Sequence, residues 1–245
     1  MSDDKRPWPQ AGYTRMILPS PIGRIGTDIV DPEPALLKQM DDQHVFMMGD
    51  NPALPRMPEK PTLLDFFRYR FNPIAVQHLF GSAKRALDDG QPDAVVMGCL
   101  LHDISNGCLI RPDHGYWSAQ LIAPYVDEEV AWAVKYHQGL RYFADPDVGY
   151  EYPTSYHRFF GKDYQVPDYL RRDAEYAAGH KWYMTARLVT IYDLYFFDDQ
   201  VQAIEPEYFD ELLARNFRQP EEGLGFDDSP TAHMWRTMIW PNNFL

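Results

Sequence analysis

The sequence has few cysteines and no long apolar run. Only Cys99 and Cys108 occur among its 245 residues, and they form no CxxC pair. Two cysteines outside a CxxC pair do not suggest a disulfide framework, and we expect both to be reduced. We therefore expect a cytoplasmic protein. No stretch approaches the roughly 20 apolar residues that span a bilayer, and the first residues lack the apolar core of a signal peptide. The sequence therefore predicts a soluble chain.

Basic residues are also in short supply. The chain has 23 Lys and Arg against 36 Asp and Glu, which gives a formal net charge of −13 at pH 7 and a pI near 4.9. Binding to nucleic acid or to an anionic membrane needs a positively charged surface. We therefore expect neither kind of partner, and we expect a small molecule as the substrate.

Residues 1–61 are dense in proline, which interrupts long helices. We interpret this region as an arm that wraps on the main domain or contacts a partner, without catalytic residues. Its histidine, His44, reads as a surface or packing residue.

Helical signals dominate from residue 62, and strand signals are nearly absent. Thr62 is a candidate N-cap, Asn72-Pro73 opens a second helix that runs to about Asp88, and Pro92-Asp93 opens a third. Further helices are predicted over residues 115–126, from 127, over 173–199 and from 206, with loops over 104–113 and 143–168. The predicted fold is all-α, with a main domain over residues 62–200. Residues 201–245 are predicted to form a C-terminal helix and an apolar tail packed on it, and the tail is compatible with a homodimer.

The third helix is the most informative stretch, because the apolar run Ala94-Val-Val-Met-Gly-Cys-Leu-Leu ends in the adjacent pair His102-Asp103. Neighbours on a helix point about 100° apart, so both side chains reach one site only near a helix end or beside a wide metal cluster. A buried carboxylate must also be paired. Imidazole and carboxylate together suit a borderline-to-hard transition metal. The candidate ligands, enough for two ions, are His78, His102, Asp103, His114, His137 and Asp193. Taken alone, each histidine also has a simpler reading as a hydrogen-bonded core residue.

The order His, His-Asp, His, His, Asp, with Leu-Leu-His-Asp closing a buried helix, resembles the HD-domain superfamily of metal-dependent enzymes over roughly residues 62–200. The resemblance implies that His102-Asp103 is the defining catalytic dyad, His78 the first ligand and Asp193 the last. His114 and His137 correspond to the members that bind two metals. The resemblance also implies that Asp103 bridges the two ions.

Two reaction classes share this ligand set. In the phosphohydrolases of the superfamily, two divalent ions such as Mn, Mg or Zn supply the nucleophile and clamp the phosphate. In a smaller branch, which includes the myo-inositol and phosphonate-cleaving oxygenases, an Fe(II)/Fe(III) pair uses O2 to cleave a C–C or C–P bond of a hydroxylated substrate. Many two-metal phosphodiesterase relatives follow the dyad with Gly-Lys, whereas this chain has Ile104-Ser-Asn. Tyr192-Asp-Leu-Tyr is similar to the last-ligand motif of myo-inositol oxygenase. We therefore expect an oxygenase, with a phosphohydrolase acting on a nucleotide or other phosphoester as the alternative.

The resemblance also gives three candidate substrate contacts, Tyr69, Asn106 and Arg141. Tyr69 is similar in its place before His78 to a lid tyrosine of the phosphonate-cleaving branch, and Arg141 falls where that branch places a cationic phosphonate contact. The simpler readings are a packing aromatic and a surface arginine. The chain departs from the oxygenases at Gly81, where they often carry Gln, and at Asn106, where they carry His. The remaining histidines lie outside the pattern: His157 reads as a surface residue, with a substrate contact as the alternative, and His180 and His233 read as structural residues.

Overall fold

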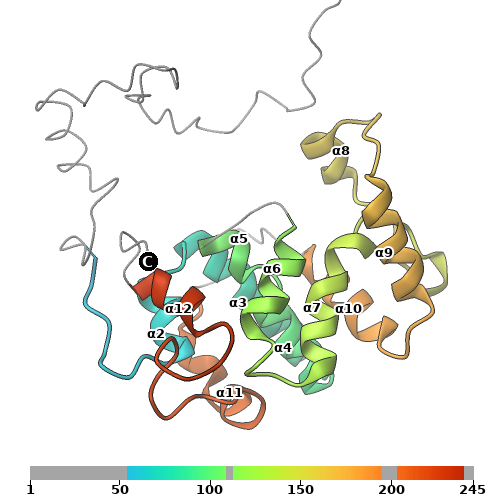
Figure 1. The fold of residues 1–245 in the computed structure, drawn as a ribbon. Coiled ribbons are helices and arrows are strands. Elements are labelled where there is room, and N and C mark those ends of the chain that lie inside the picture. Colours follow the sequence, from blue (N-terminus) through green and yellow to red (C-terminus); the bar gives the residue numbers. More distant parts are fainter. Residues whose placement is uncertain (1–53, 109–112, 195–202, 240–245) are drawn as a thin grey trace, which may run out of the picture.

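The computed structural model describes residues 54–108, 113–194 and 203–239 (Figure 1). Most of the predicted proline-rich arm, with His44, lies outside the described residues. Its described end, residues 54–61, contains no helix. No described helix combines the length and the apolar character needed to cross a membrane.

The described chain is all-α, as predicted, and has no strand; Asp145 and Tyr150 form an isolated bridge. Its α-helices are α2 (Leu63–Tyr69), α3 (Pro73–Asp88), α4 (Asp93–Leu101), α5 (Ile104–Cys108), α6 (His114–Ile122), α7 (Glu128–Leu140), α8 (Thr154–Phe160), α9 (Asp168–Ala178), α10 (Tyr183–Asp193), α11 (Asp210–Asn216) and α12 (Ala232–Ile239). Two short 3-10 helices, η1 (Pro146–Val148) and η2 (Pro206–Phe209), complete the set.

The first two predicted helix starts are confirmed by their caps. The Thr62 side chain accepts a hydrogen bond from the Asp65 backbone N–H, and the Asp65 carboxylate accepts one from the Thr62 N–H at 2.8 Å. This reciprocal pair satisfies two backbone donors that a helix start leaves open. At α3, the Asn72 side chain accepts from Ile74 N at 2.9 Å, and Pro73 takes the first helical position. Short polar side chains therefore fix where α2 and α3 begin.

Three predicted boundaries are wrong. Residues 104–108 form helix α5, because Ile104 is fully buried in the core and tertiary packing overrides the Ser-Asn-Gly signal for a loop. The predicted loop over 143–168 contains η1 and α8. The predicted long helix over 173–199 is two helices, α9 and α10, because α9 ends at Ala178 with Gly179 as its C-cap. The part of that prediction beyond residue 194 lies outside the described residues.

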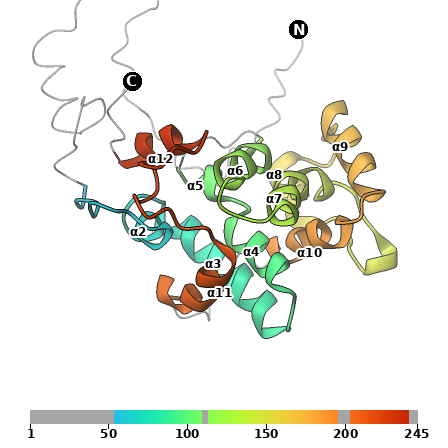
Figure 2. The ribbon, with the colours of Figure 1, turned by 60° about the horizontal axis from the view of Figure 1, so that its bottom comes forward.

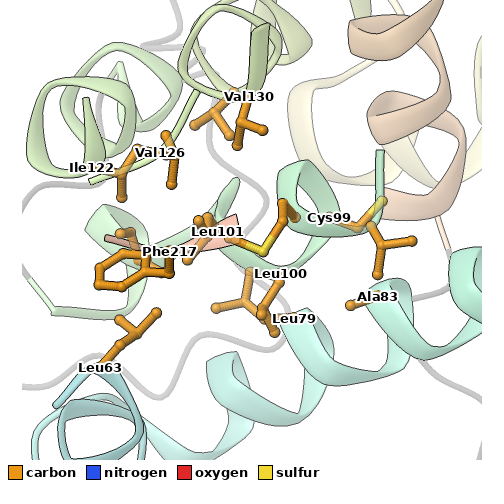
Figure 3. Packing of buried hydrophobic residues seen from close by; sticks show 14 of the residues in the cluster. Leu63, Leu79, Ala83, Cys99, Leu100, Leu101, Ile122, Val126, Val130 and Phe217 are labelled. Atoms are coloured by element: carbon orange, nitrogen blue, oxygen red, sulfur yellow. The ribbon is translucent and has the colours of Figure 1, made fainter. Parts of the chain in front are cut away.

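Helix α4 is the centre of the core and packs against α3, α7 and α10. Every residue from Val95 to Leu101 is buried, so this part of the helix presents no face to water. Figure 3 shows Cys99 and Leu101 among apolar side chains from neighbouring helices. At Gly98 a Cβ atom would lie 2.6 Å from Val189 Cγ2. Glycine therefore lets α4 and α10 approach closely.

The C-terminal segment packs back on the beginning of the domain. Leu224 N donates to Pro61 O at 2.8 Å. Trp235 is fully buried, and its ring meets that of Phe66 edge-on at a centroid distance of 4.8 Å. Its indole N–H donates to Leu121 O at 3.2 Å. Figures 1 and 2 both place α12 beside α2. The segment thus adds an aromatic layer to the core beside α2.

Candidate metal centre

The structure brings all six candidate ligands together in the interior. They come from α3, from the turn after α4, from the first residue of α6, from α7 and from the last residue of α10: His78, His102, Asp103, His114, His137 and Asp193. All six are buried. They form two groups within which one ligand atom per residue lies within 4.8 Å of the others. The buried imidazole and carboxylate groups could therefore hold metal ions.

The first group consists of His78, His102, Asp103 and Asp193. The Nε2 atoms of His78 and His102 are 3.0 Å apart, and they lie 3.2 and 3.3 Å from Asp193 Oδ1. An ion bound at about 2.1 Å places neighbouring ligand atoms roughly 3.0 to 3.4 Å apart. These three atoms therefore have the spacing of ligands that share one ion.

The second group consists of Asp103, His114 and His137. Asp103 Oδ1 lies 3.1 Å from His114 Nε2 and 3.9 Å from His137 Nε2. The other oxygen, Oδ2, faces the first group and lies 4.0 Å from His78 Nε2. One carboxylate thus presents one oxygen to each group. This arrangement suits a carboxylate that bridges two ions.

Backbone carbonyls fix the orientation of two of the imidazoles. His102 Nδ1 donates to Cys99 O at 2.8 Å, and His137 Nδ1 donates to Val134 O at 2.6 Å. A carbonyl only accepts, so the proton of each neutral ring lies on Nδ1 and the Nε2 lone pair points into the site. Nε2 of His137 is buried and has no hydrogen-bond partner in the described part of the chain. A buried acceptor left in this state fits a metal ligand.

The electrostatics of the pocket favour a positive charge at its centre. Burial disfavours the charged form of His102, but Asp103 and Asp193 outweigh this effect and raise its pKa to about 9. Burial, together with the nearby His102 and His114, lowers the pKa of His137 to about 3. Burial works against the charged form of Asp103 as well, yet the surrounding histidines hold the pKa of this carboxyl well below its usual range. A metal cation would take the place that the His102 proton holds at neutral pH.

A scan against models of protein families and a search of curated proteins gave no match to this chain. The resemblance to the HD-domain superfamily therefore rests on the ligand order, and the activity that the resemblance implies is a proposal.

Two of the three candidate substrate contacts lie against the ligands. Arg141, which follows α7, places Nη1 3.3 Å from His114 Nε2. Asn106, on α5, donates to Asp103 Oδ2 at 3.0 Å, so its amide is engaged by the dyad carboxylate. Tyr69, the last residue of α2, has no described contact with the ligands; the Arg68 guanidinium lies 5.9 Å from its ring centroid. Its role stays a prediction.

The histidines outside the pattern lie apart from the ligand groups. His180 stacks on Trp132 at 4.1 Å between ring centroids, and His157 and His233 are exposed. This placement is consistent with their simpler readings.

Tyr156 on α8 is a site residue that the sequence reasoning missed. Its side chain is buried, and its hydroxyl donates to Asp193 Oδ2 at 3.5 Å. The Arg141 guanidinium lies 4.8 Å from the centroid of its ring. Tyr156 thus contacts a ligand of the first group and the cation beside the second. Tyr156 belongs to a run of tyrosines with Tyr150 and Tyr152, and this run was the sequence feature that could have indicated it.

Metal binding is expected to release about one proton and to tighten as the pH rises from 6.5 to about 9. Metal-free His102 keeps its proton across this range, because Asp103 and Asp193 stabilise the imidazolium. Only the deprotonated ring binds a metal, so the proton competes with the ion, and affinity should rise up to about tenfold per pH unit. Calorimetric titration of Mn(II) in buffers of different ionisation enthalpy measures the released proton. A binding heat that is the same in every buffer would contradict this expectation.

Proposed function

We propose that the protein is a dinuclear metal-dependent oxygenase that uses O2 to oxidise and cleave a small hydroxylated substrate at a C–C or C–P bond. The observation that carries the proposal is the placement of the Asp103 oxygens, Oδ2 toward His78 and Oδ1 toward His114 and His137. One carboxylate between two histidine groups is suited to a pair of ions that act on the same substrate.

The donor set fits iron. Histidine nitrogens and carboxylate oxygens suit a borderline metal, and neither group of described ligands includes a thiolate. An Fe(II)/Fe(III) pair would supply one-electron chemistry toward O2 and Lewis-acid binding of the substrate hydroxyl. The chain's own residues have separate tasks. Asp103 holds the two halves of the centre together, Arg141 offers a cation for an anionic group, and the buried Tyr156 ring keeps water from the ligands.

The residues that follow the dyad support an oxygenase over a phosphohydrolase. Ser105 is fully buried and its N–H donates to Ser118 Oγ at 3.0 Å, while Asn106 contacts Asp103. Neither residue supplies the cation that the phosphodiesterase relatives place after their dyad. One observation favours the alternative: Arg141 lies beside the second group, and a guanidinium binds phosphate as readily as phosphonate. A phosphohydrolase with Mn, Mg or Zn is therefore the second candidate.

Oxygen consumption distinguishes the two functions. Protein purified without air and loaded with Fe(II) is mixed with hydroxylated phosphonates and with polyols, and dissolved O2 and cleavage products are recorded. An oxygenase consumes O2 in proportion to the product formed. A panel of nucleotides and other phosphoesters, tested with Mn(II), Mg(II) or Zn(II), reports the alternative. Phosphate release from the nucleotides or phosphoesters, without O2 uptake in the presence of the phosphonates and polyols, would favour the phosphohydrolase and overturn the proposal.

Arg141→Ala is expected to weaken use of an anionic substrate by at least about tenfold in kcat/KM, with little effect on a neutral polyol. The guanidinium is next to His114 and Tyr156, where a substrate anion would meet it. Steady-state kinetics on matched anionic and neutral substrates measure the difference. Arg218→Ala is the control, because Arg218 pairs with Asp127 on the surface. An equal loss on both substrates would remove Arg141 from the binding pocket.

A further inference from the structure

The N-terminus of α6 lies unusually close to the last turns of α7. A Cβ atom on Gly115 would lie 2.9 Å from Lys135 O and 3.1 Å from Val134 O. Those are backbone atoms, which cannot move aside as the end of a flexible side chain can. Only glycine therefore allows α6 to begin at this distance from α7. The residue before Gly115 is the candidate ligand His114, so the approach brings His114 within reach of His137; their ring centroids are 5.2 Å apart.

The two helices are tied together at this point by Gln138, the residue after His137. The Gly115 N–H donates to Gln138 Oε1 at 3.0 Å, and the bond is buried. The first N–H groups of a helix have no partner within the helix, so without Gln138 this buried donor would lose its acceptor. The bond joins α6 and α7, which carry the two histidines of the second group. Gly115 follows His114 in the chain, and Gln138 follows His137.

We infer that Gln138 is a positioning residue for the second metal ion. By holding Gly115, it sets the separation of His114 and His137 around Asp103 Oδ1. The inference rests on the proposed dinuclear site. The turn before α6 adds to the constraint, because Asp113 has a left-handed backbone with φ of 53° and its carboxylate accepts from the Tyr169 hydroxyl at 2.5 Å. The position of His114 is thus constrained by the hydrogen bond of Asp113 before it and by the hydrogen bond of Gly115 after it.

Gln138→Met tests the inference, because methionine keeps the size of the side chain and removes the acceptor. The full-length chain is titrated with Mn(II), followed by calorimetry and by the electron paramagnetic resonance signal of a coupled Mn(II) pair. We expect the second ion to bind about 10- to 100-fold more weakly, the usual effect of removing an outer partner of a metal ligand. The first ion should keep its affinity, and the coupled-pair signal should be lost at metal concentrations that saturate the wild type.

Two further variants separate positioning from general destabilisation. Gln138→Glu keeps an acceptor for the Gly115 N–H, and a negative charge is favourable at a helix N-terminus, so it should restore the second ion. Gln77→Met is the matched control. Gln77 precedes the ligand His78, and its amide bonds the backbone of Ile204 at 2.9 and 3.0 Å, away from the second group. It should leave the second ion unchanged. If Gln138→Met does not fold, Gln138→Asn withdraws the acceptor by one methylene and should give the same selective loss.

The outcomes separate this inference from the proposed function. A wild-type chain that binds one Mn(II) or none overturns the dinuclear site itself. If the wild-type chain binds two Mn(II) ions and the folded Gln138 variants bind both with unchanged affinity, the dinuclear site stands and the inference about Gln138 is overturned. Equal weakening of both ions in Gln138→Met, or equal weakening of the second ion in Gln77→Met, also overturns it.

Discussion

Asp103→Ala is expected to abolish binding of both metal ions while leaving the helices folded. Among the described residues, Asp103 is the one that belongs to both ligand groups, so its loss removes a donor from each. It also removes a negative charge that offsets the mutual repulsion of two cations. Turnover should fall at least about 1,000-fold, the scale of removing an essential catalytic group. Metal content after dialysis and the far-ultraviolet circular dichroism spectrum measure the two parts of the expectation.

A matched control is Asp93→Asn. Asp93 is the first residue of the helix that leads to the dyad, and its carboxylate pairs with Arg215 on the surface. Exposed ion pairs contribute little to stability, so this variant should keep two ions and full turnover. Turnover retained in Asp103→Ala would rule out this site as the catalytic centre.

Trp235→Ala is expected to lower the free energy of unfolding by about 3 to 5 kcal/mol, the range for truncating a fully buried tryptophan. The side chain packs on Phe66 and Tyr125, and its N–H bond to Leu121 O would be lost as well. Chemical denaturation of the metal-free chain, followed by circular dichroism, measures the change. The predicted cause is the loss of the layer that the C-terminal segment adds over α2.

Phe226→Ala provides the comparison, because Phe226 lies in the same segment but is 39% exposed. Its expected effect is below about 1 kcal/mol. If Trp235→Ala were no more costly than Phe226→Ala, the C-terminal segment would not be part of the cooperative core.

Short-range chemistry made much of this fold predictable. The caps at Thr62 and Asn72 act within three residues, so the sequence shows them directly. The apolar run before the dyad predicted a buried helix, and α4 is one. The α5 and α9–α10 boundaries were missed, because burial of Ile104 depends on distant partners and the break after α9 interrupts a periodic pattern.

For the candidate site, residue type and order were sufficient to select six ligands that the structure brings together. Their division into two groups depends on how α3, α4, α6, α7 and α10 cross, which no local pattern contains. Tyr156 was missed because it lies in a stretch without helical periodicity. Gln138 was missed because its partner, Gly115, is 23 residues away. Both residues matter through tertiary contacts.

The metal content of protein purified without air, without added metal and without a histidine tag tests the dinuclear centre most directly. Later first-row metals bind such donors more tightly than Fe(II). Iron that stays bound in competition with zinc would therefore indicate a site that selects iron. We predict two irons per chain, one for each ligand group, and a mixed-valent electron paramagnetic resonance signal after brief exposure to air. Two Mn, Mg or Zn ions without a redox response would favour the phosphohydrolase. One ion per chain, or none, would contradict the dinuclear centre.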